Sequence, residues 1–146
     1  MTAKTKDILD ATKATILALS LTGIDDANVE IRKVASDVGL TMPGIVIVFL
    51  RRVPNKTGVT HFVDWVYHVM VAMLVADNHD LTENETYDGW MESINNAFHE
   101  QRLDGVSTAY RCEVAPSDSV DRQAWDAQKL VGVTILRFIS REPRGT

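Results

Sequence analysis

The clearest pattern in the chain is an alternation that runs from Thr60 to about Ala76. From Val63 to Met73 every second position is apolar, whereas the positions between them mix apolar residues with Asp64 and His68. Because side chains alternate between the two faces of a strand, the pattern predicts one long strand with one face toward the core. The other face is expected to meet a surface that also accepts polar side chains, such as a neighbouring subunit. The uniformly apolar positions are Val63, Trp65, Tyr67, Val69, Val71 and Met73.

Four further segments have the composition of strands. Residues 28–34 alternate weakly and predict a short strand, and residues 45–52 form a β-branched run typical of a strand buried on both faces. Residues 53–59 contain proline, asparagine and glycine and predict a hairpin turn. The last strand is expected over residues 129–140. The segment 106–114 also alternates, and its side toward the core is predicted to consist of Val106, Thr108, Tyr110, Cys112 and Val114.

Two segments have the periodicity of amphipathic helices. Residues 5–20 form the first, with Gly23 as a stop signal after it. The second is predicted to open at the capping-box pair Thr82 and Glu85 and to end at Asp104 and Gly105. The apolar stripe of the first helix is Ile8, Leu9, Thr12, Ile16 and Leu19, and that of the second is Tyr87, Trp90, Met91, Ile94, Ala97 and Phe98.

This order of elements favours hairpins over strand–helix–strand units. We therefore expect an α+β fold with a mainly antiparallel sheet flanked by two helices. At 146 residues the chain is expected to be a single domain. It would consist of the N-terminal helix at about 5–20, the sheet and second helix at about 28–140, and a short basic tail at 141–146.

The charge balance limits the classes of partner. The chain has a net charge of −5, which argues against nucleic acid as a general surface ligand, because such binding relies on Lys and Arg. A single cysteine, Cys112, excludes an intrachain disulfide. The longest apolar stretch, residues 69–76, is much shorter than a membrane-spanning helix needs, and the N-terminus has no signal-peptide pattern. We therefore expect a protein made in a cytoplasm, without a membrane partner.

No combination of residues predicts catalysis. His61 and His68 are seven positions apart and so point to opposite faces of one strand, which argues against a shared metal ion. Cys112 is expected to be a small core residue, and the glycines are too scattered to form a phosphate-binding loop. The sequence therefore predicts no catalytic residues, no metal site, no cofactor and no enzymatic activity.

Arginines and tryptophans near the predicted strand ends are the candidates for a protein interface. The long segment around Trp65 and the polar loop 116–127 around Trp125 both place an indole where a neighbour could cover it. Two interpretations of the basic strand ends stay open, namely solubility with edge protection, or a charged contact in a ring. The candidate interface residues are Arg51, Arg52, Trp65, Trp125, Arg137, Arg141 and Arg144.

Four passages of the chain, taken with the element order, resemble one family. They are PGIVIVFLRR, VDWVYHVMVAMLVAD, YDGWMESINNAFHEQRLDGV and LVGVTILRFISREPRG. Over about residues 28–144 the chain is similar to the tail-terminator and tail-completion proteins of tailed bacteriophages. The resemblance implies a non-catalytic structural protein of the virion tail or neck, assembled in the host cytoplasm as a homohexameric ring. Such a ring caps the tail tube and joins it to the head connector, while DNA passes through the lumen without specific binding.

Three other functions stay open from the sequence. A neck or head-completion protein bound to the portal would share the same general properties. A small adaptor module of non-viral origin could hold a peptide or ligand against its sheet. A small hydrolase would use His61 or His68 together with Asp64.

Overall fold

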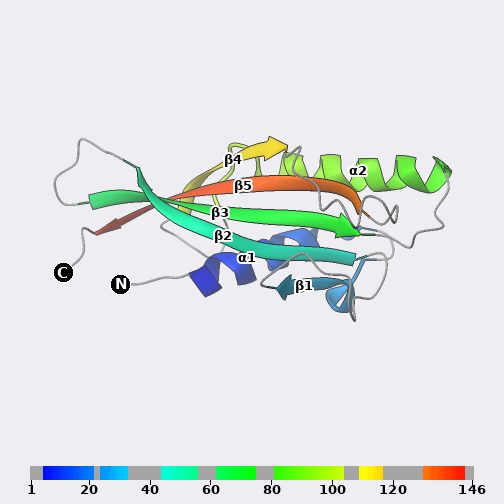
Figure 1. The fold of residues 1–146 in the computed structure, drawn as a ribbon, viewed down its shortest axis with the longest axis horizontal. Helices are drawn as coiled ribbons and strands as arrows, with labels where there is room; N and C mark the ends of the chain where they lie inside the picture. The colour runs from blue at the N-terminus through cyan, green and yellow to red at the C-terminus, as the bar shows by residue number, and fades with distance from the viewer. Residues whose placement is uncertain are drawn as a thin grey trace.

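The computed structural model describes residues 5–21, 24–32, 44–55, 62–74, 81–103, 109–116 and 130–143. The elements of this part appear in the predicted order of helix, short strand, strand hairpin, helix and two strands (Figure 1). They are α1 (Thr5–Ala18), a short 3-10 helix η1 (Asp26–Asn28), β1 (Val29–Arg32), β2 (Gly44–Asn55), β3 (Phe62–Leu74), α2 (Leu81–Phe98), β4 (Ala109–Pro116) and β5 (Leu130–Pro143).

The strands form one mixed sheet in the order β1-β2-β3-β5-β4. β1 runs parallel to β2, and each of the other neighbouring pairs is antiparallel. This confirms the α+β class and the β2–β3 hairpin. β3 is the central strand and pairs over its length with β2 on one side and β5 on the other. Its position explains why residues 60–76 carry the strongest apolar pattern in the sequence, because a central strand meets neighbours along its length.

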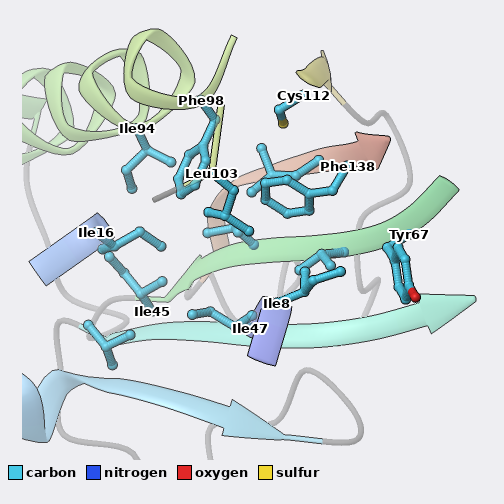
Figure 2. Packing of buried hydrophobic residues seen from close by; sticks show 14 of the residues in the cluster. Ile8, Ile16, Ile45, Ile47, Tyr67, Ile94, Phe98, Leu103, Cys112 and Phe138 are labelled. Carbon is cyan, nitrogen blue, oxygen red and sulfur yellow. The ribbon is translucent and has the colours of Figure 1, made fainter. Parts of the chain in front are cut away.

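Both helices lie on the same face of the sheet, which we call the helix face. Their apolar side chains share one cluster with side chains of β2, β3, β4 and β5 (Figure 2). The ring of Phe98 on α2 stands edge-on to that of Phe138 on β5, with 5.8 Å between the ring centroids. The predicted core side of the long strand is confirmed, since the four positions from Tyr67 to Met73 on this side are fully buried and Trp65 packs against them.

The other face of the sheet, the opposite face, carries the alternate side chains of the same strands. Val46, Val48, Ala72 and Leu74 form a second buried cluster there, to which no residue of α1 or α2 belongs. Because Ile45 and Ile47 are buried on the helix face, the predicted burial of both faces is confirmed for residues 45–48, but it is wrong for residues 50–52, which are exposed.

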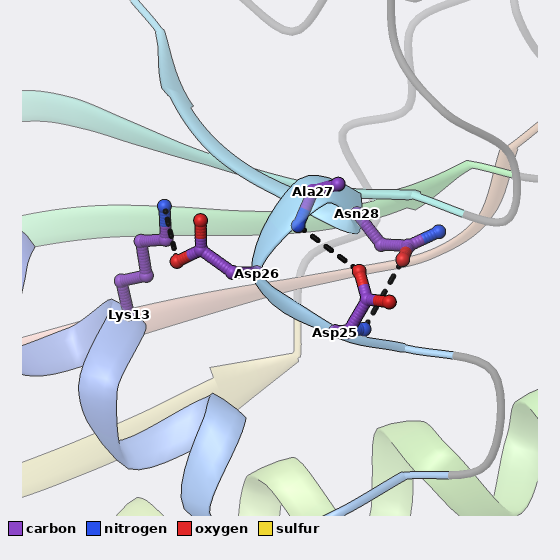
Figure 3. Close-up of polar contacts among 5 residues, drawn as sticks. All are labelled: Lys13, Asp25, Asp26, Ala27 and Asn28. Carbon is purple, nitrogen blue, oxygen red and sulfur yellow. Dashed lines mark hydrogen bonds and ion pairs between the residues drawn. The ribbon is translucent and has the colours of Figure 1, made fainter.

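The N-terminal helix reaches β1 through a compact polar turn (Figure 3). The Asp25 carboxylate accepts a hydrogen bond from the Ala27 amide at 3.0 Å, and the Asn28 side-chain oxygen accepts one from the Asp25 amide at 3.1 Å. These reciprocal bonds form a capping box at the start of η1. The Lys13 amine lies 3.3 Å from the Asp26 carboxylate and links α1 to this turn. β1 is thereby positioned directly after η1 and beside β2.

The second helix ends six residues before the predicted position. α2 stops at Phe98, where its apolar stripe also stops, and Glu100 takes a left-handed backbone conformation with a φ of 60°. The amide of Glu100 then donates to the Cys112 carbonyl at 2.8 Å, and the amide of Leu103 donates to the Ala109 carbonyl at 3.1 Å. The prediction of a helix up to Asp104 is wrong because this segment instead covers the outer edge of β4. The helix also begins at Leu81, one residue before the predicted cap.

Three register shifts interrupt the pairing of the described strands, and one of them lies between Met73 and Leu74 of β3, opposite β5. The register between β2 and β3 shifts between Phe49 and Arg51, so that Leu50 is an extra residue and 42% exposed.

The third shift lies in β4, between Ala109 and Arg111. Ala109 and Cys112 are therefore both buried, although a regular strand would place them on different faces. The prediction for the core side of the 106–114 strand is confirmed at Cys112 and at Val114, which packs against the same cluster, whereas Ala109 is an additional buried residue. Val106 and Thr108 lie outside the described residues, as does the side chain of Tyr110.

Two strands run further than the sequence predicts. β2 continues to Asn55, which pairs with Asp64, so the hairpin turn does not begin at Val53. β5 continues to Pro143, which pairs with Phe62, so the basic tail does not begin at Arg141. The ends of β2, β3 and β5 thus form an arm, residues 51–55, 62–67 and 138–143, at the left of Figure 1. β4 pairs with β5 as far as Ser140, so the tip of the arm beyond Ser140 consists of three strands.

Candidate interaction surface

The structure divides the candidate interface residues between the two faces of the sheet. Arg51, Arg137 and Arg141 lie on the opposite face, on which their cross-strand neighbours are His68 and Asp64. Arg52 and Trp65 lie on the helix face of the arm. The two remaining candidates, Trp125 and Arg144, fall outside the described residues.

Arg52 and Trp65 contact each other within the arm. The Arg52 guanidinium lies 4.0 Å from the centroid of the Trp65 ring and 5.9 Å from that of Tyr67. Such a cation–π contact at an exposed site contributes roughly 0.5–1 kcal/mol. The Tyr67 hydroxyl donates to the Glu142 carboxylate at 2.8 Å, and burial, followed by this carboxylate, raises the pKa of Tyr67. These contacts join the three strands of the arm, so they have a structural role in the protomer.

Arg141 is also engaged within the protomer. Its Nε lies 2.9 Å from Oδ1 of Asp64, and its Nη2 lies 3.3 Å from Oδ2, which makes a two-pronged pair across β3 and β5. The Asp64 side chain is only 6% exposed, whereas that of Arg141 is 47% exposed. Removal of the guanidinium would take a counter-charge at 2.9 Å away from a nearly buried carboxylate, which is destabilising. Arg141 is therefore a residue of β5 with a stabilising partner, and the prediction that it belongs to a basic tail is wrong.

Three adjacent strands of the opposite face carry a line of basic side chains. Arg51 of β2 is opposite His68 of β3, which is opposite Arg137 of β5. We call these three residues the basic row. Neighbouring strands lie about 4.8 Å apart, so the row is about 10 Å long. Burial, and then the charges of Arg51 and Arg137, lower the pKa of His68, which is only 9% exposed.

The two arginines of the row differ from most of the other described basic residues. Arg51 and Arg137 are exposed, and no side-chain hydrogen bond or ion pair of either is found among the described residues. Glu113 of β4 lies opposite Arg137, but its carboxylate is 3.8 Å from the guanidinium of Arg111. Arg51 and Arg137 lie on β2 and β5, about 10 Å apart, and the lowered pKa of His68 leaves the imidazole between them uncharged at neutral pH. The row therefore offers two exposed arginine charges to an anionic partner.

Half-buried apolar side chains border the basic row on both sides. Val66 and Ile139 follow it toward the tip of the arm, and Met70 and Ile135 follow it toward the body of the sheet. An apolar patch crossed by arginines has the composition found at the centres of protein interfaces. This patch with the basic row is the candidate interaction surface.

The structure keeps His68 and Asp64, one of the alternative catalytic pairs, apart. They share a face of β3, but they are four positions apart, which is about 13 Å along the strand, and Asp64 already pairs with Arg141. His61 lies outside the described residues. Burial raises the pKa of the Cys112 thiol to about 12, on the other face of the sheet. In the described ranges, no group of three or more His, Cys, Asp or Glu residues is placed to hold a metal ion.

Sequence reasoning found the two arginines of the row but not their alignment with His68. The irregularity at Leu50 decides which of Arg51 and Arg52 shares a face with His68, and nothing in the apolar pattern marks it. The pairing of Tyr67 with Glu142 was also missed, because Glu142 was assigned to the tail.

No protein-family model matches the chain, and no curated protein sequence is significantly similar to it. Neither helix of the described part is long and apolar enough to cross a membrane.

Proposed function

We propose that this protein is a structural component of a tailed-phage virion that forms a ring, terminates the tail tube and joins it to the head connector. The observation that carries the proposal is the candidate interaction surface on the opposite face of the sheet. Two arginines without an ion-pair partner in the described residues lie there among half-buried apolar side chains, in a chain of net charge −5. The resemblance of residues 28–144 to tail-terminator proteins is the reason for proposing a ring of identical subunits.

The proposed ring is a homohexamer whose other partners are the tail tube protein and a connector or head-completion protein. In a closed ring each copy uses two different complementary surfaces, and the basic, apolar patch is one of them. The acidic balance of the chain fits a lumen through which DNA passes, because phosphate contacts would hold the DNA. The function requires no cofactor and no catalytic residue.

Electron microscopy of the purified chain, alone and mixed with tail tubes, tests this proposal. We expect class averages of rings with a central opening, and density for the chain at one end of each tube. Rings that bind the connector but never a tube end would favour the alternative of a neck or head-completion protein. The absence of both rings and tube binding would refute the proposal.

A further inference from the structure

His68 lies between two arginines that belong to the neighbouring strands of the sheet. Arg51 of β2 and Arg137 of β5 are its cross-strand partners, and all three residues are on the opposite face. Both arginines are exposed, whereas His68 is only 9% exposed. Cross-strand side chains on one face are about 5 Å apart at their Cβ atoms, and like charges at such positions destabilise a sheet. A proton on His68 would therefore place three positive charges side by side.

We propose that the basic row binds carboxylate groups of a neighbouring polypeptide, and that His68 takes up a proton when these groups bind. This inference rests on the proposed function for the identity of the neighbour, which in a ring is the next copy of the chain. It adds to that function the chemistry of the contact and its dependence on pH.

The surroundings of the row favour an acidic polypeptide over a nucleic acid. The two arginines lie about 10 Å apart and have no ion-pair partner among the described residues, so their charges remain available to an anion. The half-buried apolar side chains on both sides of the row can be covered by side chains of a polypeptide, whereas a sugar-phosphate backbone would leave them uncovered. The chain is itself an acidic polypeptide, with 20 Asp and Glu against 15 Lys and Arg.

The charged groups near His68 come from three other strand positions besides the two arginines. On its own strand, Asp64 lies about 13 Å away along β3 and is already paired. On β4, Glu113 lies opposite Arg137, and its carboxylate is 3.8 Å from the guanidinium of Arg111. Both helices pack on the other face of the sheet. The charges that act most directly on His68 are therefore those of the two arginines of the row.

These two charges set the direction of the coupling. In the free protein, burial and then the charges of Arg51 and Arg137 lower the pKa of His68. Carboxylates bound above the row would offset the arginine charges and raise this pKa. The complex then holds the proton more tightly than the free protein does, so binding of the carboxylates is accompanied by proton uptake.

This difference in pKa determines how the affinity depends on pH. Proton uptake occurs between the lower pKa of the free protein and the higher pKa of the complex. The affinity should therefore rise as the pH falls through this interval, by at most about tenfold for each pH unit. Because the pKa of free His68 lies below the ordinary value of about 6.5, we expect the gain between about pH 7 and pH 5, where carboxylates are still charged.

Isothermal titration calorimetry with a hexaglutamate peptide tests the site without requiring assembly. A chain of net charge −5 repels such a peptide as a whole, so binding at low salt reports a local basic site. Titrations in two buffers of different ionisation enthalpy give the number of protons taken up. We expect tighter binding at pH 5.5 than at pH 7.5, with uptake of part of a proton in this range.

Three variants separate the roles within the row. Arg51→Gln with Arg137→Gln should weaken binding by about tenfold or more, because bonds to charged groups are lost. His68→Gln should keep the binding but lose most of the proton uptake. Arg102→Gln removes an exposed arginine outside the row and should behave as the wild type. Thermal melts show which variants fold, and if the double variant does not, each single arginine variant takes its place with the same expected direction.

Each part of the inference has an outcome that overturns it. Absence of peptide binding at pH 5.5 would overturn the site, and equal proton uptake by the wild type and His68→Gln would overturn the coupling. Tighter binding of a thymidine oligonucleotide of equal charge would overturn the choice of a polypeptide partner. Light scattering separates these results from the proposed function. Rings whose mass is unchanged by excess peptide and by pH would contradict this inference alone, whereas a chain that binds the peptide but stays monomeric at every concentration would refute the proposed function alone.

Discussion

The hydrogen bond between Tyr67 and Glu142 gives the sharpest test of the arm. Tyr67→Phe removes the hydroxyl and keeps the ring, which lies 6.5 Å from the Phe49 ring and is fully buried. The lost bond is 2.8 Å long and its acceptor is a carboxylate that is only 7% exposed as a residue. Bonds to charged groups contribute about 1.5–3 kcal/mol to stability, so we expect a loss of that size in the free energy of unfolding.

Urea denaturation followed by tryptophan fluorescence measures this loss. Thermal unfolding gives a second measure of the same loss. For a chain of about 150 residues, each kcal/mol lowers the melting temperature by about 2–4 °C, so the melting temperature of Tyr67→Phe should fall by roughly 3–12 °C. Thr134→Val is the matched control, because it removes a buried hydroxyl that donates to the neutral Asn95 oxygen at 2.9 Å. A bond between neutral groups contributes about 1 kcal/mol, so the control should lose less.

A double-mutant cycle separates the bond from other effects of the hydroxyl. In a Glu142→Gln background the acceptor has no charge, and Tyr67→Phe should then cost less than it does in the wild type. If Tyr67→Phe changes the free energy of unfolding by less than about 0.5 kcal/mol, the bond does not hold the end of β5. Equal costs in both backgrounds would likewise contradict the charge-assisted contact.

Two further predictions follow from buried titratable groups. The pKa of folded His68 is lowered, so the unfolded chain binds its proton first as the pH falls. Stability should be complete above the unfolded pKa of about 6.5 and decline as the pH falls through that value toward the lower folded pKa. Urea titrations at a series of pH values should show a weaker decline for His68→Gln, and an unchanged decline would contradict this origin. The Cys112 thiol has a pKa raised to about 12 by burial, so thiol reagents at pH 8 should modify it only as fast as the chain unfolds. Rapid modification of the native protein would show that Cys112 is accessible.

The sequence predicted best those elements in which apolar residues recur at one constant spacing along the element. The alternating side chains of β3 from Trp65 to Met73 and the stripe of α2 from Trp90 to Phe98 all belong to, or pack against, one buried cluster. The ends were harder to predict. Arg141 and Glu142 have the composition of a tail, but their partners Asp64 and Tyr67 are more than seventy residues away in the sequence. Only the register of β3 against β5 brings these pairs together.

The candidate surface depends on two features that no local pattern contains. The first is the irregularity at Leu50, which places Arg51 beside His68 and Arg52 over Trp65. The second is that both helices cover the same face of the sheet, which leaves the basic row on the other side. A helix stripe predicts that a helix packs on a sheet, but it does not say which face the helix covers.

The mass of the purified wild-type chain over a range of concentrations tests the central claim most directly. Native mass spectrometry, with light scattering as a check, should give a discrete species of about six times the 16.2 kDa chain mass. This species should lose subunits as the salt concentration rises, because salt screens any contact made by the exposed Arg51 and Arg137 of the basic row. A chain that stays at 16.2 kDa up to the highest concentration would contradict the assembly described above.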